Sequence, residues 1–451
     1  FNNMLPYVEW KRKKGIQTKI VRVSTIGNTN TNIKNYIQNE YNLGGLVWVL
    51  IVGDAADVVP GQVTVGSGTF RNSDPSYVYL RGSDWYPDAF ISRFSASSAA
   101  HVDNQVNRSI NYEKTPTTGG VWYKKGVGIA SAQGTPADST RMNWNRNLLL
   151  SYTYTQVDKI YDPTATATMV TNSLNDGRSI VNYCGHGSET SWGTSGFAVS
   201  NVQSLANGNM LPFINSVACL NGRFYRTGGP CFGEAWLQTG SSTTPAGAIG
   251  FYGSCTLQAW VPPTVAQSHS CTLLCRNRVN TLGGVYFNGS SRMIEVYLPA
   301  YDGVNEYVCW HLFGDASVQL RTDTPQSMTV SHASAIIIGQ AYFDVTVTGV
   351  PNALVGLYMD TSMVGSAYTN TSGQARVNFQ IPVNRPGTMF VTVTAYNKIP
   401  YMTTVPVISP NSAYVLYLKH TTSDQSGGNN NGQPNPGETI LMPVWVKNQG
   451  S

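Results

Sequence analysis

The chain has 451 residues, enough for two or more domains with cores of their own, and 41% of them are hydrophobic, as in a globular protein. Only 12% are charged, against about 25% in an average domain, and the net charge is +5. The modest charge argues against a nucleic-acid-binding protein, and no run approaches the roughly 20 apolar residues of a membrane span.

The chain as far as Arg321 alternates helix and strand signals. Amphipathic spacing predicts helices from near Leu5 and over 33–41, 102–110, 141–152 and 166–174. Short apolar runs predict buried strands over 46–53, 90–94, 127–132, 180–183, 213–218 and 246–252. This alternation predicts an α/β fold around a mostly parallel sheet. The basic run Lys11–Lys14 lies in the first helix, and we interpret it as a solvated helix face rather than a nucleic-acid patch.

The pattern changes after Arg321 to alternating apolar and polar residues over 343–347, 375–381 and 390–396, with Gly, Pro and Asn turns between them. We therefore expect a small all-β sandwich of immunoglobulin type. A polar Gly/Asn/Pro linker over 422–438 precedes one more strand-like run, 439–446. A single strand makes no domain, so we expect this run to open a further, truncated β module.

Two stretches carry the chemistry: SIVNYCGHGSET (179–190) and LPFINSVACLNGRF (211–224). Each begins as a buried strand and ends in a turn, with His186 in the first turn and Cys219 in the second. Because chemistry gathers beyond the carboxyl ends of parallel strands, neighbouring strands of this kind would hold an imidazole beside a thiol, as a cysteine nucleophile requires. Gly187 would leave its amide free to stabilise an oxyanion. The alternative is that Cys219 is a small buried hydrophobe.

The other six cysteines indicate no metal site, because the chain has no CxxC pair and its six histidines are scattered. One or two disulfides are compatible with the sequence, which assigns no pairing. His311, in an apolar stretch beside Trp310, is interpreted as a packed structural residue.

The segments GHGSETSWGTSGF (185–197) and VACLNGRF (217–224) closely resemble the catalytic core of the gingipain family of secreted cysteine peptidases. The resemblance continues through PCFGEA (230–235), SCTLQAW (254–260), GGVYFNG (283–289) and WHLFGDASVQLRT (310–322), and more weakly through 49–60, 89–97 and 129–136. It covers nearly all of residues 1–322 and implies a caspase-like α/β/α sandwich. We therefore expect catalytic subdomains over 1–115 and 116–322, the immunoglobulin-like sandwich over 323–408, and the linker with the truncated module over 409–451.

Carried over by position, the resemblance implies that Cys219 is the nucleophile and His186 the general base and acid. The amides of Gly187 and Cys219 would form the oxyanion hole. Gln133 stands where the family usually has an acidic residue behind the histidine. An amide oxygen can orient an imidazole, but it stabilises an imidazolium less than a carboxylate does.

Family members cleave after basic residues, and the resemblance places the pocket for that side chain at five positions. Asp138 matches the buried acid of the arginine-specific members, Gln258 and Trp260 match the side wall and the lid, and Val217 and Cys184 match the lining. A carboxylate that faces a guanidinium forms a strong bidentate pair. The alternative is that Asp138 caps the following helix, which would leave a different specificity, such as lysine, open.

The resemblance further implies protein or peptide substrates, structural calcium, an activating propeptide, and an extracellular location reached by the type IX secretion route. The sequence assigns no calcium ligands, although several carboxylates offer suitable oxygens: Asp54, Asp57, Asp74, Asp84, Asp88 and Glu189. The predicted function is thus a secreted cysteine endopeptidase that cleaves after basic residues, arginine first. The competing hypothesis is a catalytically weakened peptidase scaffold that serves as a surface adhesin or structural protein.

Overall fold

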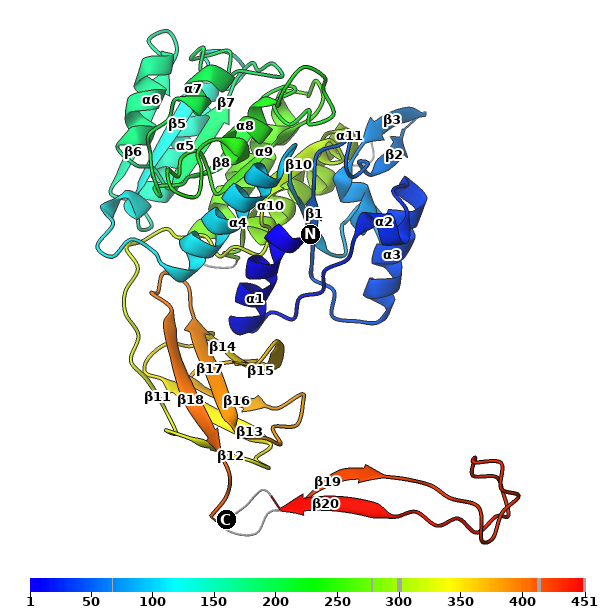
Figure 1. The fold of residues 1–451 in the computed structure, drawn as a ribbon. Helices are drawn as coiled ribbons and strands as arrows, with labels where there is room; N and C mark the ends of the chain where they lie inside the picture. The colour runs from blue at the N-terminus through cyan, green and yellow to red at the C-terminus, as the bar shows by residue number, and fades with distance from the viewer. Residues whose placement is uncertain (67, 277–278, 298–301, 412–414, 449–451) are drawn as a thin grey trace. The chain divides into compact units, whose positions relative to one another are not determined.

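The computed structural model describes the chain except for residues 67, 277–278, 298–301, 412–414 and 449–451 (Figure 1). By its internal contacts it divides into two compact units. The first comprises Phe1–Val8, Lys19–Ser327 and Tyr396–Ile399, and the second comprises Glu9–Thr18, Met328–Ala395 and Pro400–Ser451. The domain boundaries given above stay predictions.

An eight-stranded sheet forms the centre of the first unit, in the order β1-β4-β10-β9-β8-β7-β5-β6. All neighbouring strands are parallel except the pair β9 and β10. The strands are β1 (Trp48–Val52), β4 (Phe90–Phe94), β5 (Lys125–Ala130), β6 (Gln156–Tyr161), β7 (Ile180–Cys184), β8 (Phe213–Val217), β9 (Gly250–Ser254) and β10 (Trp310–Gly314). A separate hairpin joins β2 (Gln62–Val65) to β3 (Thr69–Asn72).

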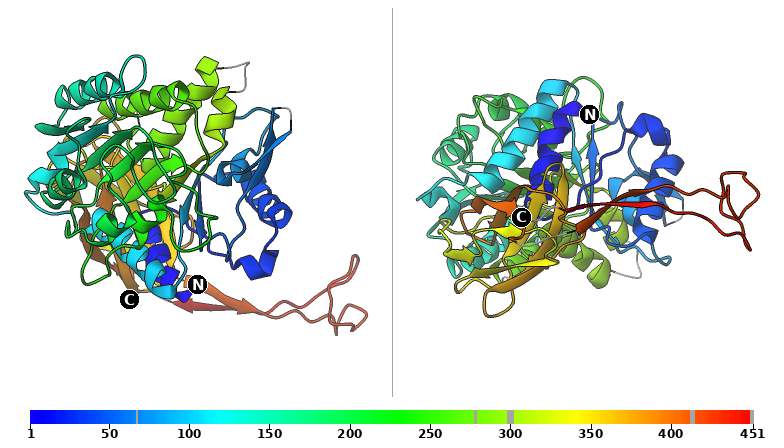
Figure 2. Two further views of the ribbon diagram at one scale, coloured as in Figure 1. Left: turned by 90° about the horizontal axis from the view of Figure 1, so that it is seen from above. Right: turned by 60° about the horizontal axis from the view of Figure 1, so that its bottom comes forward.

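Both faces of this sheet are buried, which explains why its strands read as continuous apolar runs. In β8, Phe213 faces one hydrophobic core and Ile214 faces the other. Helices α5, α9 and α10 contribute to the first core, and α6, α7 and α8 contribute to the second, so helices cover both sides of the sheet (Figures 1 and 2). The expected α/β sandwich with a mostly parallel sheet is therefore confirmed.

The five predicted helices lie close to α1, α3, α4, α5 and α6, and several begin at a side chain that caps the helix. The interpretation of Lys11–Lys14 as a solvated helix face is wrong, because Lys11 and Lys14 are buried. The hydroxyl groups of Thr29, Ser98 and Thr166 accept hydrogen bonds from main-chain N–H groups in the first turns of α3, α4 and α6. The helices are α1 (Leu5–Lys13), α2 (Val23–Ile26), α3 (Asn30–Asn42), α4 (Ala99–Lys114), α5 (Asp138–Leu150), α6 (Ala167–Asn175), α7 (Val199–Gln203), α8 (Phe232–Gln238), α9 (Val261–Cys275), α10 (Leu282–Tyr297) and α11 (Asp302–Tyr307). None of the described helices is long and apolar enough to cross a lipid bilayer.

The second unit is rich in β-structure, as predicted, and its core lies between a three-stranded and a five-stranded sheet. Its strands are β11 (Val330–His332), β12 (Ile336–Ile337), β13 (Tyr342–Val347), β14 (Leu354–Met359), β15 (Ser362–Tyr368), β16 (Gln374–Asn378), β17 (Gly387–Thr394) and β18 (Tyr401–Ile408). A two-stranded hairpin of β19 (Val415–His420) and β20 (Val444–Asn448) follows, and the predicted polar linker connects its strands.

Candidate active site

The two reactive side chains leave neighbouring strands of the sheet at the same level. Strands β7 and β8 are parallel, and their last residues, Cys184 and Val217, are partners in the register. His186 and Cys219 each follow two residues later. The ends of two buried strands thus bring the imidazole and the thiol to one edge of the sheet, as the sequence predicts.

The turns after these strands approach each other closely, and Gly187 is the residue that permits it. A Cβ atom at this position would lie 2.7 Å from the Cβ of Ala218 and 2.9 Å from the carbonyl oxygen of Cys219. On the other side, Leu220 adopts a φ of 63°, a left-handed conformation that is uncommon outside glycine. Among the described residues, the N–H groups of Gly187 and Cys219 have no hydrogen-bond acceptor. Both are therefore available to an oxyanion.

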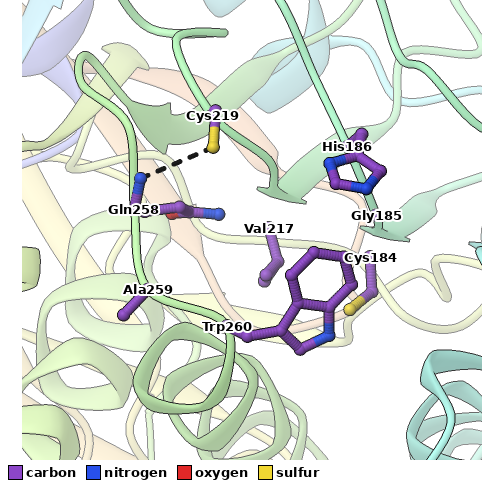
Figure 3. A pocket seen from close by; sticks show the side chains of 8 residues that line it. All are labelled: Cys184, Gly185, His186, Val217, Cys219, Gln258, Ala259 and Trp260. Carbon is purple, nitrogen blue, oxygen red and sulfur yellow. Dashed lines mark hydrogen bonds between the residues drawn. The ribbon is translucent and has the colours of Figure 1, made fainter. Parts of the chain in front are cut away.

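The His186 ring is oriented by Gln133. The amide oxygen Oε1 of Gln133 lies 2.9 Å from His186 Nε2, and because this oxygen can only accept, Nε2 carries the proton. Nδ1 is then the unprotonated nitrogen of the neutral ring, and it lies on the side that faces Cys219 (Figure 3). The Trp260 indole contacts the His186 ring edge-on at a centroid distance of 5.1 Å. The structure thus places Gln133 behind the histidine, where the resemblance puts it.

A small pocket opens beside the two reactive groups (Figure 3). Six of the nine predicted site residues line it, together with two that the prediction did not include, Gly185 and Ala259: the full lining is Cys184, Gly185, His186, Val217, Cys219, Gln258, Ala259 and Trp260. The main-chain N–H of Gln258 donates to Cys219 Sγ at 3.5 Å. Gln258 and Trp260 therefore form one wall of the pocket, and Cys219 contacts that wall directly.

Asp138 lies behind this pocket and is fully buried. Its Oδ1 accepts the Trp260 indole N–H at 2.9 Å, and its Oδ2 accepts the Ser131 hydroxyl at 2.5 Å. It begins α5, but Ala137 is the N-cap residue and no side chain caps this helix, so the alternative of Asp138 as a helix cap is wrong. Burial, with Asp138 nearby, raises the pKa of the Cys184 thiol well above its usual value. Cys184 therefore stays a neutral thiol next to the carboxylate.

Other candidate groups have structural partners. His311 is buried, and its Nε2 accepts the Asp74 N–H at 3.0 Å, which supports the structural interpretation.

All seven cysteines are free thiols. The described residues contain no group of three metal-ligating side chains, and two of the calcium candidates are neutralised by arginines: Asp74 by Arg93, and Glu189 by Arg223 and Arg226.

Comparisons with known proteins agree with this geometry. Gingipain R2 of Porphyromonas gingivalis is 35% identical over 435 residues, which cover 93% of this chain and 58% of that protein. The crystal structure of the Arg-specific cysteine proteinase gingipain R matches with a TM-score of 0.85 at 34% identity, over 90% of this chain and 95% of that one. The complex of the Porphyromonas gingivalis RgpB pro- and mature domains matches equally well, over 90% and 97%.

A more distant relative is Lys-gingipain HG66 of the same organism, 26% identical over 458 residues, which cover 93% of this chain and 26% of that protein. The chain thus spans little more than half the length of Gingipain R2 and about a quarter of this Lys-gingipain. The model of Peptidase family C25 matches residues 2–321, which hold the whole sheet and the pocket described above. The chain belongs to Peptidase family C25.

Proposed function

We propose that the chain is an endopeptidase that cleaves after basic residues, arginine first, with Cys219 as the nucleophile. The observation that carries this proposal is the placement of His186 and Cys219 at the ends of paired parallel strands, with Gln133 2.9 Å from the far nitrogen of the imidazole. A thiol, an oriented base and two free main-chain N–H groups are the parts that acyl transfer needs.

In the proposed reaction, His186 Nδ1 takes the proton of the Cys219 thiol, and the thiolate attacks the scissile carbonyl carbon. The N–H groups of Gly187 and Cys219 donate to the oxyanion that forms. The imidazolium then gives its proton to the leaving amine, and the C–N bond breaks to leave a thioester on Cys219. A water molecule that His186 deprotonates hydrolyses this thioester and restores the thiol.

The proposed specificity rests on Asp138. A carboxylate at the back of a small pocket favours a long cationic side chain, and a guanidinium can bind both carboxylate oxygens at once. In this structure the two oxygens bind Trp260 and Ser131. An incoming arginine would therefore take the place of the indole N–H at Oδ1 and leave the Trp260 ring as a lid above it. The higher identity to Gingipain R2 than to the Lys-gingipain, 35% against 26%, also favours arginine.

Related proposals concern the setting of the enzyme. We propose an extracellular location, export by the type IX route and activation by removal of a propeptide, in line with the solved complex of RgpB pro- and mature domains. Structural calcium also stays a prediction, and melting temperatures with and without a chelator would test it. None of the steps above depends on it.

The test is hydrolysis of two fluorogenic peptides that differ only in a terminal Arg or Lys. We expect the Arg peptide to be cleaved faster, and Cys219→Ala to abolish cleavage of both. Cys275→Ala is the matched control, because this buried α9 thiol lies outside the pocket. Failure of the reduced wild-type protein to cleave either peptide would contradict the proposal and favour the weakened adhesin scaffold, for which Gln133 in place of an acid is the supporting observation.

A further inference from the structure

The segment between β9 and α9, residues 256–260, forms the pocket wall, and hydrogen bonds hold it in place. The Leu220 N–H donates to the Thr256 carbonyl oxygen at 3.0 Å, which links the segment to the turn after the nucleophile. Within the segment, the Gln258 N–H donates to Cys219 Sγ and the Trp260 indole donates to Asp138. These bonds join the wall to the nucleophile and to the proposed specificity acid.

A further hydrogen bond links the wall to helix α11. The N–H of Ala259 donates to Glu306 Oε1 at 2.7 Å. Glu306 lies on α11 with only 9% of its surface exposed, and within the described part of the chain it forms no salt bridge. This bond is stronger when the carboxyl group is ionised, because a charged acceptor forms a stronger hydrogen bond than a neutral one. Ala259 lies between Gln258 and Trp260, so this bond holds the wall between the two residues that contact Cys219 and Asp138.

The surroundings of Glu306 set its charge. Its pKa is raised chiefly by burial, and further by the neighbouring Cys309 and Asp302. It is lowered by the hydrogen bond from Ala259 and by Arg71 on β3, and the resulting pKa is about 8. Because the ionised form is the stronger acceptor, the bond to Ala259 strengthens as the pH rises through this range.

We propose that Glu306 is a positioning residue of the peptidase: through the Ala259 N–H it fixes the pocket wall so that Gln258 reaches Cys219 and Trp260 reaches Asp138. Without this acceptor the segment would be free to move away from both. The Gln258 N–H would then stabilise the Cys219 thiolate less, and the lid would close less well over a bound side chain. This inference rests on the proposed function of Cys219.

Three variants test the role. Glu306→Leu removes the acceptor at similar size, and Glu306→Gln keeps an acceptor oxygen but removes the charge. Glu295→Gln makes the same chemical change at an exposed position on α10, where Glu295 pairs with Arg292. Each variant is compared with the wild-type chain for kcat and KM on the Arg peptide, for melting temperature, and for the pH dependence of Cys219 alkylation by iodoacetamide.

We expect Glu306→Leu to lower kcat/KM by about tenfold or more, and to shift Cys219 alkylation to higher pH. Glu306→Gln should recover most of the activity at neutral pH, with a loss below about threefold. The ratio of wild-type to Glu306→Gln activity should rise as the pH passes through about 8, because only the wild-type carboxyl ionises there. Glu295→Gln should leave all of these properties unchanged.

The proposal is overturned if Glu306→Leu keeps kcat/KM within about twofold of wild type, or loses activity only in proportion to its folded fraction with an unshifted alkylation profile. If Glu306→Leu does not fold, a constant ratio of wild-type to Glu306→Gln activity across the pH range overturns it instead. Cys219→Ala distinguishes this failure from failure of the proposed function, because activity that survives in Cys219→Ala would contradict the nucleophile itself.

Discussion

The turns after β7 and β8 and the wall segment after β9 are placed by different kinds of contact. The turns carry His186 and Cys219, and their position follows from the main-chain register of two paired strands. The wall segment depends on side chains far away in sequence, Asp138 at 122 residues from Trp260 and Glu306 at 47 residues from Ala259. The comparison indicates that the sheet fixes His186 and Cys219, the proposed reacting groups, whereas long-range side-chain contacts fix the proposed specificity pocket. Changes in the turns should therefore remove the reaction, and changes around the wall should modify it.

The largest effect is expected from His186→Ala, which removes the base from the first turn. The side chain is exposed, so the melting temperature should change little, whereas kcat/KM should fall at least about 10³-fold. Steady-state hydrolysis of the Arg peptide measures this loss, with His101→Ala on α4 as the control histidine. If His186→Ala hydrolysed the Arg peptide at the wild-type rate, the imidazole would have no role in the mechanism.

Gly187→Ala should lower kcat by about a hundredfold. The added methyl group would meet Ala218 and Cys219 at 2.7 and 2.9 Å, so the two turns would have to separate and the oxyanion donors would move. Rapid-quench measurement of acylation detects this effect on the chemical step. An unchanged acylation rate would show that the close approach of the turns is not needed.

Among the contacts of the wall segment, Asp138 is expected to matter most for specificity. Asp138→Asn should lower kcat/KM for the Arg peptide by at least about tenfold and reduce the preference for Arg over Lys. The amide oxygen of Asn can still accept the Trp260 indole, so the wall should keep its place. Asp176→Asn is the matched control, because the Asp176 side chain is exposed and lies outside the pocket, in ion pairs with Lys125 and Arg178. An unchanged ratio of the two substrates would exclude Asp138 as the specificity acid.

Gln133→Glu should have the smallest effect, a shift rather than a loss. A carboxylate 2.9 Å from Nε2 would stabilise the imidazolium more than the amide oxygen does. His186 must lose this proton before it can act as the base, so the acidic limb of the profile of kcat/KM should move up by about one pH unit. Superimposable pH profiles for the two proteins would show that Gln133 has no electrostatic influence on the dyad.

The sequence predicts the catalytic edge well because local signals determine it. The apolar runs before His186 and Cys219 end where β7 and β8 end, and the glycine after the histidine marks the close approach of the turns. The place of Gln133 and of the pocket residues came from the resemblance, because no spacing rule connects residues so far apart in the chain.

Other features could not be predicted because they depend on tertiary contacts. The left-handed Leu220 has no local signal, since leucine rarely adopts a positive φ. In the sequence, Glu306 looks like any glutamate on a helix. Only the tertiary structure shows that it accepts the Ala259 N–H of the wall. Strand β6 lies at the edge of the sheet with exposed Gln156 and Lys159, so it lacks the apolar run that marks the other strands.

The most direct test of the account is to treat the reduced protein with a peptide that ends in an arginyl chloromethyl ketone, and to identify the modified residue by mass spectrometry. The account predicts a thioether on Cys219 alone among the seven cysteines, formed faster than with the lysyl analogue and lost in His186→Ala. Modification of another cysteine, or none under conditions in which the protein is folded, would contradict it.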